Sequence, residues 1–249
     1  MCLIFLSYQQ HPEYPLIVLA NRDEFYRRPT EQASYWSNDD VLAGKDIEGG
    51  GTWLGLNQNG KLAMLTNYRD LKNIKANAPT RGKLVSNFLQ GDFNPEQYLM
   101  ALDQSAPLYN GYNIILGTVH DPWYYSNYQR KIYRLGSGLY GLSNELLDSP
   151  WPKVVNGKAS VNAALQSSKI DREALFDLMR NAHQANDDEL PDTGIGLSKE
   201  RALSPMFIST PDYGTRCTTL IMMNTSGEVT FEERTYVPDN TQVAYQFTL

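Results

Sequence analysis

The chain has 249 residues and a formal net charge of −6 at pH 7, because 28 Asp and Glu outnumber 22 Lys and Arg. This balance lacks the basic footprint of a nucleic-acid-binding protein, so no nucleic-acid partner is expected. No apolar run approaches the roughly 18 residues of a membrane helix, and "LIFL" is too short for a signal peptide, so we expect a cytoplasmic protein with no integral membrane segment.

The first third of the chain predicts strands and loops. "CLIFLS" and "YPLIVLANRDE" are apolar runs typical of strands, joined by a polar segment that contains proline. Residues 27–52 are polar and glycine-rich and predict a loop. "TWLGLNQNGKLAMLTNY" predicts a hairpin, because an Asn-Gly turn separates two apolar runs.

Helices are predicted in the middle of the chain and strands at its end. "KLVSNFLQ", "PEQYLMALDQ", "SPWPKVVNGKASVNAALQSS" and "DREALFDLMRNAHQA" have helical apolar spacing or helix-start residues, although Gly157 weakens the third. Residues 109–144 predict several strands, and residues 186–205 predict a long polar loop. "MFIST", "GTRCTTLIMMN", "EVTFEERTYV" and "QVAYQFTL" predict the closing strands.

The order of these elements indicates the fold class. Strands lie at both ends and helices cluster between them, without the alternation of a doubly wound parallel sheet. We therefore expect an α+β protein with largely antiparallel sheets covered by helices. No linker or repeat divides the chain, so residues 1–249 are expected to form a single domain.

Common catalytic and metal-binding motifs are missing from the sequence. His11, His120 and His183 have no ligand spacing, and there is no CxxC pair, so no metal site is expected. There is also no phosphate-binding GxxxxGK[ST] loop and no GxSxG nucleophile motif. These absences leave Cys2 as the candidate for nucleophilic chemistry.

Cys2 follows the initiator methionine directly, and its small size makes removal of Met1 sterically reasonable. Cys2 would then carry both a thiol and a free α-amine. Because the pKa of an α-amine is about 8, the amine could accept the thiol proton at neutral pH. Nucleophile and base would be one residue, which needs no histidine. The alternative is that Cys2 is a small buried core residue.

The stretch "ANRDEF" places four polar residues at the end of an apolar strand, where burial is costly unless they are paired. Strand alternation predicts that Asn21 and Asp23 face one side and Arg22 the other. One reading is a strand end with an internal ion pair. The other is that one side faces the amine of Cys2.

Five motifs together resemble one family. In order, "MCLIFLSY…LIVLANRDEFYRRP", "GGTWLGLNQNGKLAMLTNYRD", "YGLSNELLDSPWPK", "DYGTRCTTLIMMN" and "FEER" resemble the NRDE family, also called the transport and Golgi organization protein 2 family, over essentially the whole chain. That family resembles the N-terminal nucleophile hydrolases of the penicillin V acylase and bile-salt hydrolase branch. The resemblance implies a four-layer αββα sandwich of two largely antiparallel sheets.

The resemblance also implies the site residues. Cys2 stands at the position of the nucleophile, and Asp23 matches the aspartate beside its amine. Asn67 would supply a backbone amide, Asn144 a side chain that holds the oxyanion, and Arg216 a late-strand cation. The expected catalytic residues are thus Cys2, Asp23, Asn67, Asn144 and Arg216, converging on one pocket, and the expected substrate-binding residues are Asn21, Arg22 and Tyr68.

One position departs from the pattern of the branch. The branch has an arginine three residues before its aspartate, and here that position is Ala20. Alternation predicts that Arg22 points the other way, which leaves Arg216 as the candidate replacement. By the same reasoning Cys217 is expected to point away from the site, as a core thiol that does not pair with Cys2.

Two functions follow from the resemblance. The first is an N-terminal-cysteine hydrolase that cleaves a non-peptide C–N (amide) bond of a small or acyl substrate after Met1 is removed, without a cofactor. The alternative is a non-catalytic binding or trafficking protein on the same scaffold. Its ligand would be haem or acyl-CoA and lipid, because the resemblance implies haem trafficking and lipid metabolism.

Overall fold

A computed structural model describes residues 2–36, 40–167 and 169–249. The chain divides into two compact units. Unit 1 comprises Met1–Arg27, Ser137–Ser143 and Leu147–Gln246, and unit 2 comprises Arg28–Gly136, Asn144–Leu146 and Phe247–Leu249. The single-domain assignment for residues 1–249 stays a prediction.

Unit 1 contains a six-stranded sheet whose strand order is β10-β1-β2-β11-β12-β13. β1 pairs antiparallel with β10 and β2, and β11 pairs antiparallel with β2 and β12. All residues of β1 and the first eight of β2 are buried, which explains why these strands are apolar on both faces. The strands are β1 (Cys2–Tyr8), β2 (Leu16–Phe25), β10 (Gly138–Leu142), β11 (Tyr213–Met223), β12 (Glu228–Thr235) and β13 (Thr241–Thr248).

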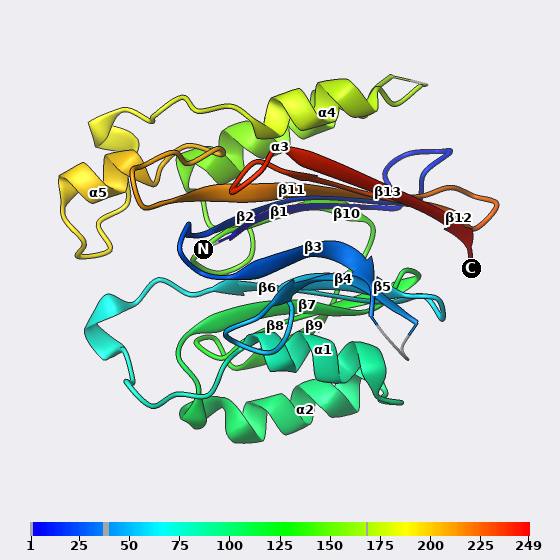
Figure 1. Cartoon of the computed structure of the whole chain (residues 1–249), viewed down its shortest axis with the longest axis horizontal. Helices are drawn as coiled ribbons and strands as arrows, with labels where there is room; N and C mark the ends of the chain where they lie inside the picture. Colours follow the sequence, from blue (N-terminus) through cyan, green and yellow to red (C-terminus); the bar gives the residue numbers. More distant parts are fainter. Residues whose placement is uncertain (1, 37–39, 168) are drawn as a thin grey trace. The chain divides into compact units, whose positions relative to one another are not determined.

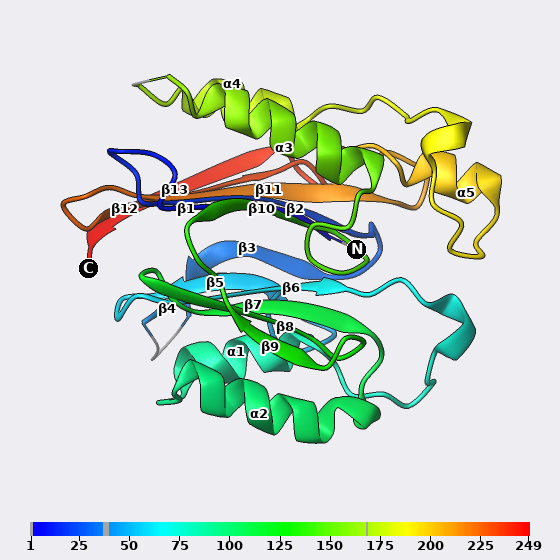
Figure 2. The same ribbon diagram turned by 180° about the vertical axis from the view of Figure 1, so that it is seen from behind.

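Two helices of unit 1 cover one face of this sheet (Figures 1 and 2). α3 (Pro152–Ala164) begins with a proline at its first position, and the side chain of Asp171 caps α4 (Arg172–Met179). The core beneath them joins apolar residues of both helices to Leu3, Phe5, Ile17, Leu19 and Leu220 of the sheet. The odd-numbered positions of β1 and β2 therefore face the helices. Unit 1 also contains the short helices η3 (Asp187–Glu189) and α5 (Leu197–Ala202).

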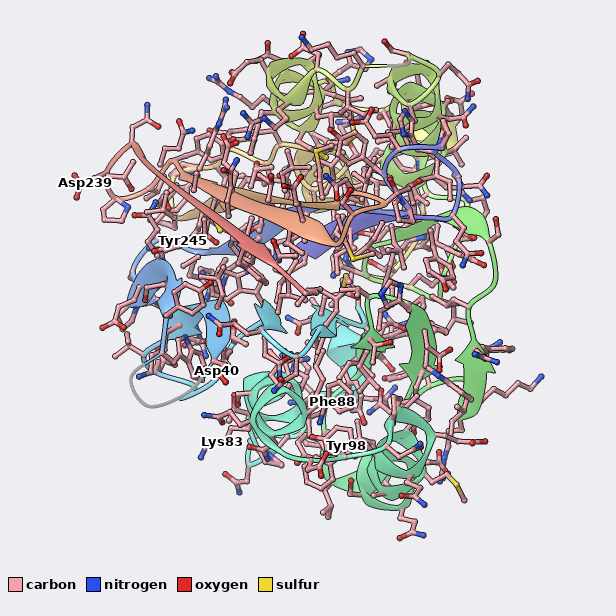
Figure 3. The ribbon with its side chains drawn as sticks, turned by 90° about the vertical axis from the view of Figure 1, so that its right-hand side faces the viewer. Asp40, Lys83, Phe88, Tyr98, Asp239 and Tyr245 are labelled. Atoms are coloured by element: carbon pink, nitrogen blue, oxygen red, sulfur yellow. The ribbon has the colours of Figure 1, made fainter. Side chains whose placement is uncertain are left out.

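Unit 2 contains a seven-stranded antiparallel sheet in the order β3-β4-β5-β6-β7-β8-β9. Its helices α1 (Gly82–Gln90) and α2 (Pro95–Ser105) pack on one face through Phe88 and Tyr98, whose ring centroids lie 5.3 Å apart (Figure 3). The strands are β3 (Thr30–Tyr35), β4 (Val41–Asp46), β5 (Leu54–Asn57), β6 (Lys61–Asn67), β7 (Tyr112–Thr118), β8 (Asp121–Ser126) and β9 (Lys131–Arg134), with short 3-10 helices η1 (Leu71–Asn73) and η2 (Ala106–Leu108).

The fold class predicted from the sequence is confirmed as α+β with antiparallel sheets, but three segments differ from expectation. The expected loop 27–52 contains β3 and β4. The sequence did not predict β3 because this strand is largely exposed, lies at the edge of its sheet and has no apolar run. Residues 37–39 of that loop, and residue 168 after α3, lie outside the described residues. The expected strand 206–210 forms only an isolated bridge, between Ser209 and Gly214. α5 lies within the expected loop 186–205.

No helix among the described residues is both long and apolar enough to cross a membrane.

Gly157 of α3 is required by close packing and not by backbone conformation. A methyl group at this position would lie 2.2 Å from Cζ of Phe5 and 2.9 Å from Sδ of Met206. We predict that Gly157→Ala lowers the free energy of unfolding by about 1–3 kcal/mol, although alanine favours a helix by ~1 kcal/mol. Denaturant titration measures this change.

The double variant with Phe5→Leu provides the control for this prediction. Shortening the side chain that meets the new methyl group should make the two substitutions clearly less than additive. A Gly157→Ala variant that is more stable than the wild type would contradict the packing argument.

Candidate functional site

Cys2 lies in a row of side chains that crosses three strands of unit 1. It is the first residue of β1 and is buried, and its partner directly opposite on β2 is Arg22. On its other side Arg22 lies opposite Cys217 of β11. Directly opposite residues of antiparallel strands point to the same face of a sheet. Cys2, Arg22 and Cys217, which we call the cysteine row, therefore share the face opposite to the one that α3 and α4 cover.

A β-bulge creates this row and corrects the expected orientation of Cys217. Thr215 lies opposite Asp23 while Cys217 lies opposite Arg22, so Arg216 is an extra residue between them. The bulge breaks the alternation, and Cys217 lies on the face of Cys2 instead of pointing away from it. Both cysteines are buried and free, as expected. Two strand spacings separate their Cα atoms by about 10 Å, beyond the range of about 4.4–6.8 Å that a disulfide needs.

The predicted alternation along β2 is confirmed, because Arg22 faces away from the side of Asn21 and Asp23. Ala20 and Arg22 are two residues apart on β2 and therefore share a face. Ala20 lies opposite Ile4, and Arg22 lies opposite Cys2. Arg22 therefore lies on the same face as Ala20, one strand repeat further along.

Charges near Cys2 act against one another. Burial raises the pKa of its thiol, and the carboxylate of Asp23 adds to the rise. The positive charge of the N-terminal amine, the guanidinium of Arg22 and a backbone hydrogen bond from Asp23 favour the thiolate and lower that pKa. The hydroxyl of Ser143 donates a long hydrogen bond of 3.4 Å to the carbonyl of Cys2.

Asp23 follows Arg22 and is buried on the helix-covered face of the sheet. Its Oδ1 accepts a hydrogen bond of 2.7 Å from the hydroxyl of Thr215. Burial raises the pKa of Asp23, while the ammonium group of Lys153 and the Thr215 hydrogen bond lower it. Sequence reasoning missed Lys153, which is buried and donates from Nζ to the carbonyl of Leu203 at 3.0 Å. The signal was present, because "SPWPK" was part of the quoted motifs.

Asn21 is buried on the same face as Asp23 and holds β2 against neighbouring segments. Its Nδ2 donates to the carbonyls of Met179 and Met206 at 2.9 and 2.8 Å, and its Oδ1 accepts from the hydroxyl of Thr218 at 2.6 Å. Both amide hydrogens are used within unit 1. Substrate contact by Asn21 stays a prediction, while its structural role is visible.

Arg216, at the bulge, joins the ends of three segments. Its guanidinium donates to the backbone carbonyls of Phe25 and Tyr26 at 3.1 and 3.2 Å, and to that of Val237 at 3.4 Å. Burial lowers the pKa of Arg216, and the positive charge of Arg22 lowers it further. Arg216 therefore holds the backbone at the end of β2.

Unit 2 brings the other three predicted residues together. Asn67 ends β6, and its carbonyl accepts a hydrogen bond of 2.9 Å from Nδ2 of Asn144. The carbonyl of Asn144 accepts from the amide of Arg69 at 2.7 Å. The ring of Tyr68 stacks on that of Tyr128 at 3.9 Å. Asn144 thus clamps the end of β6 on both sides of Tyr68.

The predicted site residues thus form two groups. The group in unit 1 consists of Cys2, Asn21, Arg22, Asp23 and Arg216. The group in unit 2 consists of Asn67, Tyr68 and Asn144. The convergence of all of them on one pocket stays a prediction.

The described residues contain no group of three or more His, Cys, Asp or Glu that could hold a metal ion. The ring nitrogens of His11 already face partners: Nε2 lies 3.1 Å from the carbonyl of Ser167, and Nδ1 accepts from the amides of Glu13 and Tyr14. His120 and His183 are exposed.

Two solved structures have a fold similar to that of this chain. Penicillin V acylase from Agrobacterium tumefaciens matches with a TM-score of 0.53 and 12% identity, over 100% of this chain and 86% of that one. A cysteine-to-alanine mutant of conjugated bile acid hydrolase from Clostridium perfringens matches with a TM-score of 0.54 and 10% identity, over 98% and 92%. At these identities the likeness shows the fold alone, which this chain shares with the two solved structures, an α+β fold with antiparallel sheets.

The sequence then identifies the family. The profile described as Transport and Golgi organisation 2 matches residues 1–238. The Transport and Golgi organization protein 2 homolog of Bos taurus is 38% identical, covering 94% of this chain and 92% of its own length. The homolog of Mus musculus is 36% identical, over 100% and 99%. The chain belongs to this family, as its motifs predicted.

The buried charge of Asp23 leads to a stability prediction. Because the folded pKa of Asp23 lies above its ordinary value of 3.8, the folded state binds this proton more tightly than the unfolded state. The contribution of Asp23 to stability is therefore lost as the pH rises from 3.8 through the folded pKa. We predict that Asp23→Asn, which keeps an acceptor for Thr215, melts a few degrees higher than the wild type at pH 7.

The comparison is made by thermal unfolding across a pH series. The advantage of Asp23→Asn should shrink as the pH falls toward 4, where the wild-type carboxyl becomes protonated. Asp171→Asn, at the exposed cap of α4, is the matched control, because asparagine caps a helix about as well as aspartate. An Asp23→Asn variant that is destabilised at pH 7 would show that the charge favours the folded state.

Proposed function

We propose that this protein is an N-terminal-cysteine hydrolase that cleaves a non-peptide C–N (amide) bond of a small or acyl substrate after Met1 is removed. One observation carries the proposal: Cys2 opens β1 directly opposite Arg22, and the next residue, Asp23, is a buried carboxylate. Nucleophile, cation and carboxylate thus come from the ends of two paired strands. The fold of the solved relatives supports the same class of reaction.

The proposed reaction needs no cofactor. The α-amine of processed Cys2 accepts the thiol proton, and the thiolate forms a bond to the carbonyl carbon of the amide. The tetrahedral intermediate collapses, the C–N bond breaks, and the leaving nitrogen takes the proton from the amine. Water then attacks the thioester, which releases the carboxylic acid and restores the thiol. In this scheme Asp23 holds the amine in position.

Asn67 and Asn144 are the proposed oxyanion donors. The hydrogen bond from Asn144 to the carbonyl of Asn67 links the two residues in unit 2, so the side chain of one fixes the backbone of the other. Donors preorganised in this way stabilise negative charge that develops in the transition state. Tyr68, stacked on Tyr128 beside Asn67, is the proposed substrate contact of this group.

The neighbours' names indicate the class of substrate. They are an acylase and a hydrolase of conjugated bile acid, and a small amide or acyl ligand is the proposed counterpart here. A cytoplasmic location and haem or lipid trafficking stay predictions, drawn from the sequence and the family resemblance.

Processing of Met1 is the first requirement. We predict that the purified chain has the intact mass of a protein that begins at Cys2, and that Cys2→Ala reduces the turnover of an amide library by at least about 10³-fold, because a covalent step is lost. Cys217→Ala, which removes the other thiol, is the matched control and should keep most of the activity.

Each result has a definite meaning. A retained Met1, or an undiminished rate in Cys2→Ala, would exclude catalysis by Cys2. A Cys2→Ala variant that still binds a ligand that the wild type does not cleave would favour the binding protein on the same scaffold.

Asn144 gives a second kinetic prediction. Asn144→Ala should lower kcat by about 10²–10³ with little change in KM, because an oxyanion donor acts mainly in the transition state. Asn87→Ala, which removes an exposed amide on α1 (Gly82–Gln90), is the control and should leave kcat within about twofold, as surface changes away from a site usually do. An Asn144→Ala variant that changes only KM would contradict the oxyanion role.

A further inference from the structure

The cysteine row contains two buried thiols and a single guanidinium between them. Cys2 and Cys217 lie on either side of Arg22, and all three side chains are at most 8% exposed. The positive charge of Arg22 favours the thiolate of both cysteines, and a thiolate at one raises the pKa of the other. Both thiols therefore share the charge of Arg22, while the N-terminal amine also acts on Cys2 and Arg216 also acts on Cys217.

Glu233 of β12 lies beside Cys217 and distinguishes the two thiols. It is 1% exposed, and its Oε2 accepts hydrogen bonds from Sγ of Cys217 at 3.6 Å and from the hydroxyl of Thr219 at 3.2 Å. A thiol must be protonated to donate such a bond. The carboxylate of Glu233 therefore favours the neutral thiol at Cys217.

We propose that Arg22 is a positioning residue that stabilises the thiolate of Cys2, and that Glu233 directs it there by holding Cys217 in the protonated form. The proposal rests on the proposed function, because it assigns the reactive thiol to Cys2. It explains why the sheet keeps a carboxylate buried beside a second thiol, where an apolar residue would avoid the cost of desolvation.

The charges that act on the two thiols come from three strands and from the N-terminus. The N-terminal amine, Asp23 and Arg22 act on Cys2, with Asp23 on the other face of β2. Glu233 of β12, Arg22 of β2 and Arg216 of β11 act on Cys217. Burial raises the pKa of both thiols, and Glu233 raises that of Cys217 further, well above its usual range. Cys2 should consequently ionise at a lower pH than Cys217.

The pH titration of the two thiols can be followed without any substrate. The full chain is labelled with ¹³C at the cysteine β-carbons, which gives two resonances whose shifts report the protonation state of each thiol. Cys217→Ser assigns them. In the wild type we expect the Cys2 resonance to move at lower pH than that of Cys217.

Three variants test the roles of the two charges. Arg22→Gln should raise both midpoints by about one pH unit or more, whereas Arg22→Lys should keep most of the effect, since an opposite charge at this range shifts a pKa by about 1–3 units. Glu233→Gln should lower the Cys217 midpoint by about one unit or more and leave that of Cys2 unchanged or higher. Arg27→Gln, at an exposed arginine, is the control and should shift neither midpoint.

An unchanged Cys2 midpoint in Arg22→Gln would overturn the role of Arg22, and an unchanged Cys217 midpoint in Glu233→Gln would overturn that of Glu233. If Arg22→Gln does not fold, the Glu233→Gln titration and the order of the wild-type midpoints still decide the proposal. The proposed function fails separately, through a retained Met1 or an active Cys2→Ala variant, because the titration requires no turnover.

Discussion

The register of β2 between β1 and β11 is the constraint on which the rest of the site depends. On one side it sets Arg22 opposite Cys2, and on the other a bulge at Arg216 sets Arg22 opposite Cys217. Since side chains alternate along β2, this register sends Asn21 and Asp23 to the helix-covered face. A shift of one residue would exchange the two faces and separate the arginine from both thiols.

Much of the fold could be predicted because local signals agreed with it. The apolar runs of β1 and β2, the Asn-Gly turn before β6 and the aspartate that caps α4 all predicted the elements that form. β3 could not be predicted, because an exposed edge strand has no apolar run. The bulge at Arg216 escaped prediction as well, since nothing in "GTRCTT" shows where strict alternation stops. That one residue is the reason why the orientation of Cys217 was predicted wrongly.

The sequence predicted several residues of the candidate site, but it did not predict all of the charged groups that act there. The motifs selected Cys2, Asp23 and Asn144, but sequence reasoning did not find Lys153, which acts on Asp23, or Glu233, which acts on Cys217. Burial of ionisable groups costs stability unless they are paired, and perturbed pKa values gather at functional sites. The concentration of such groups where β1, β2 and β11 meet therefore supports a site and not simply a core.

The central claim is that processed Cys2 presents its amine to Asp23 and its thiol to the face of Arg22. A high-resolution crystal structure of the mature protein tests this most directly. We predict that the density begins at Cys2, with the amine nitrogen about 3 Å from a carboxylate oxygen of Asp23 and with Sγ on the face of the sheet that carries Arg22. Density for an attached Met1, or an amine directed away from Asp23, would contradict the account.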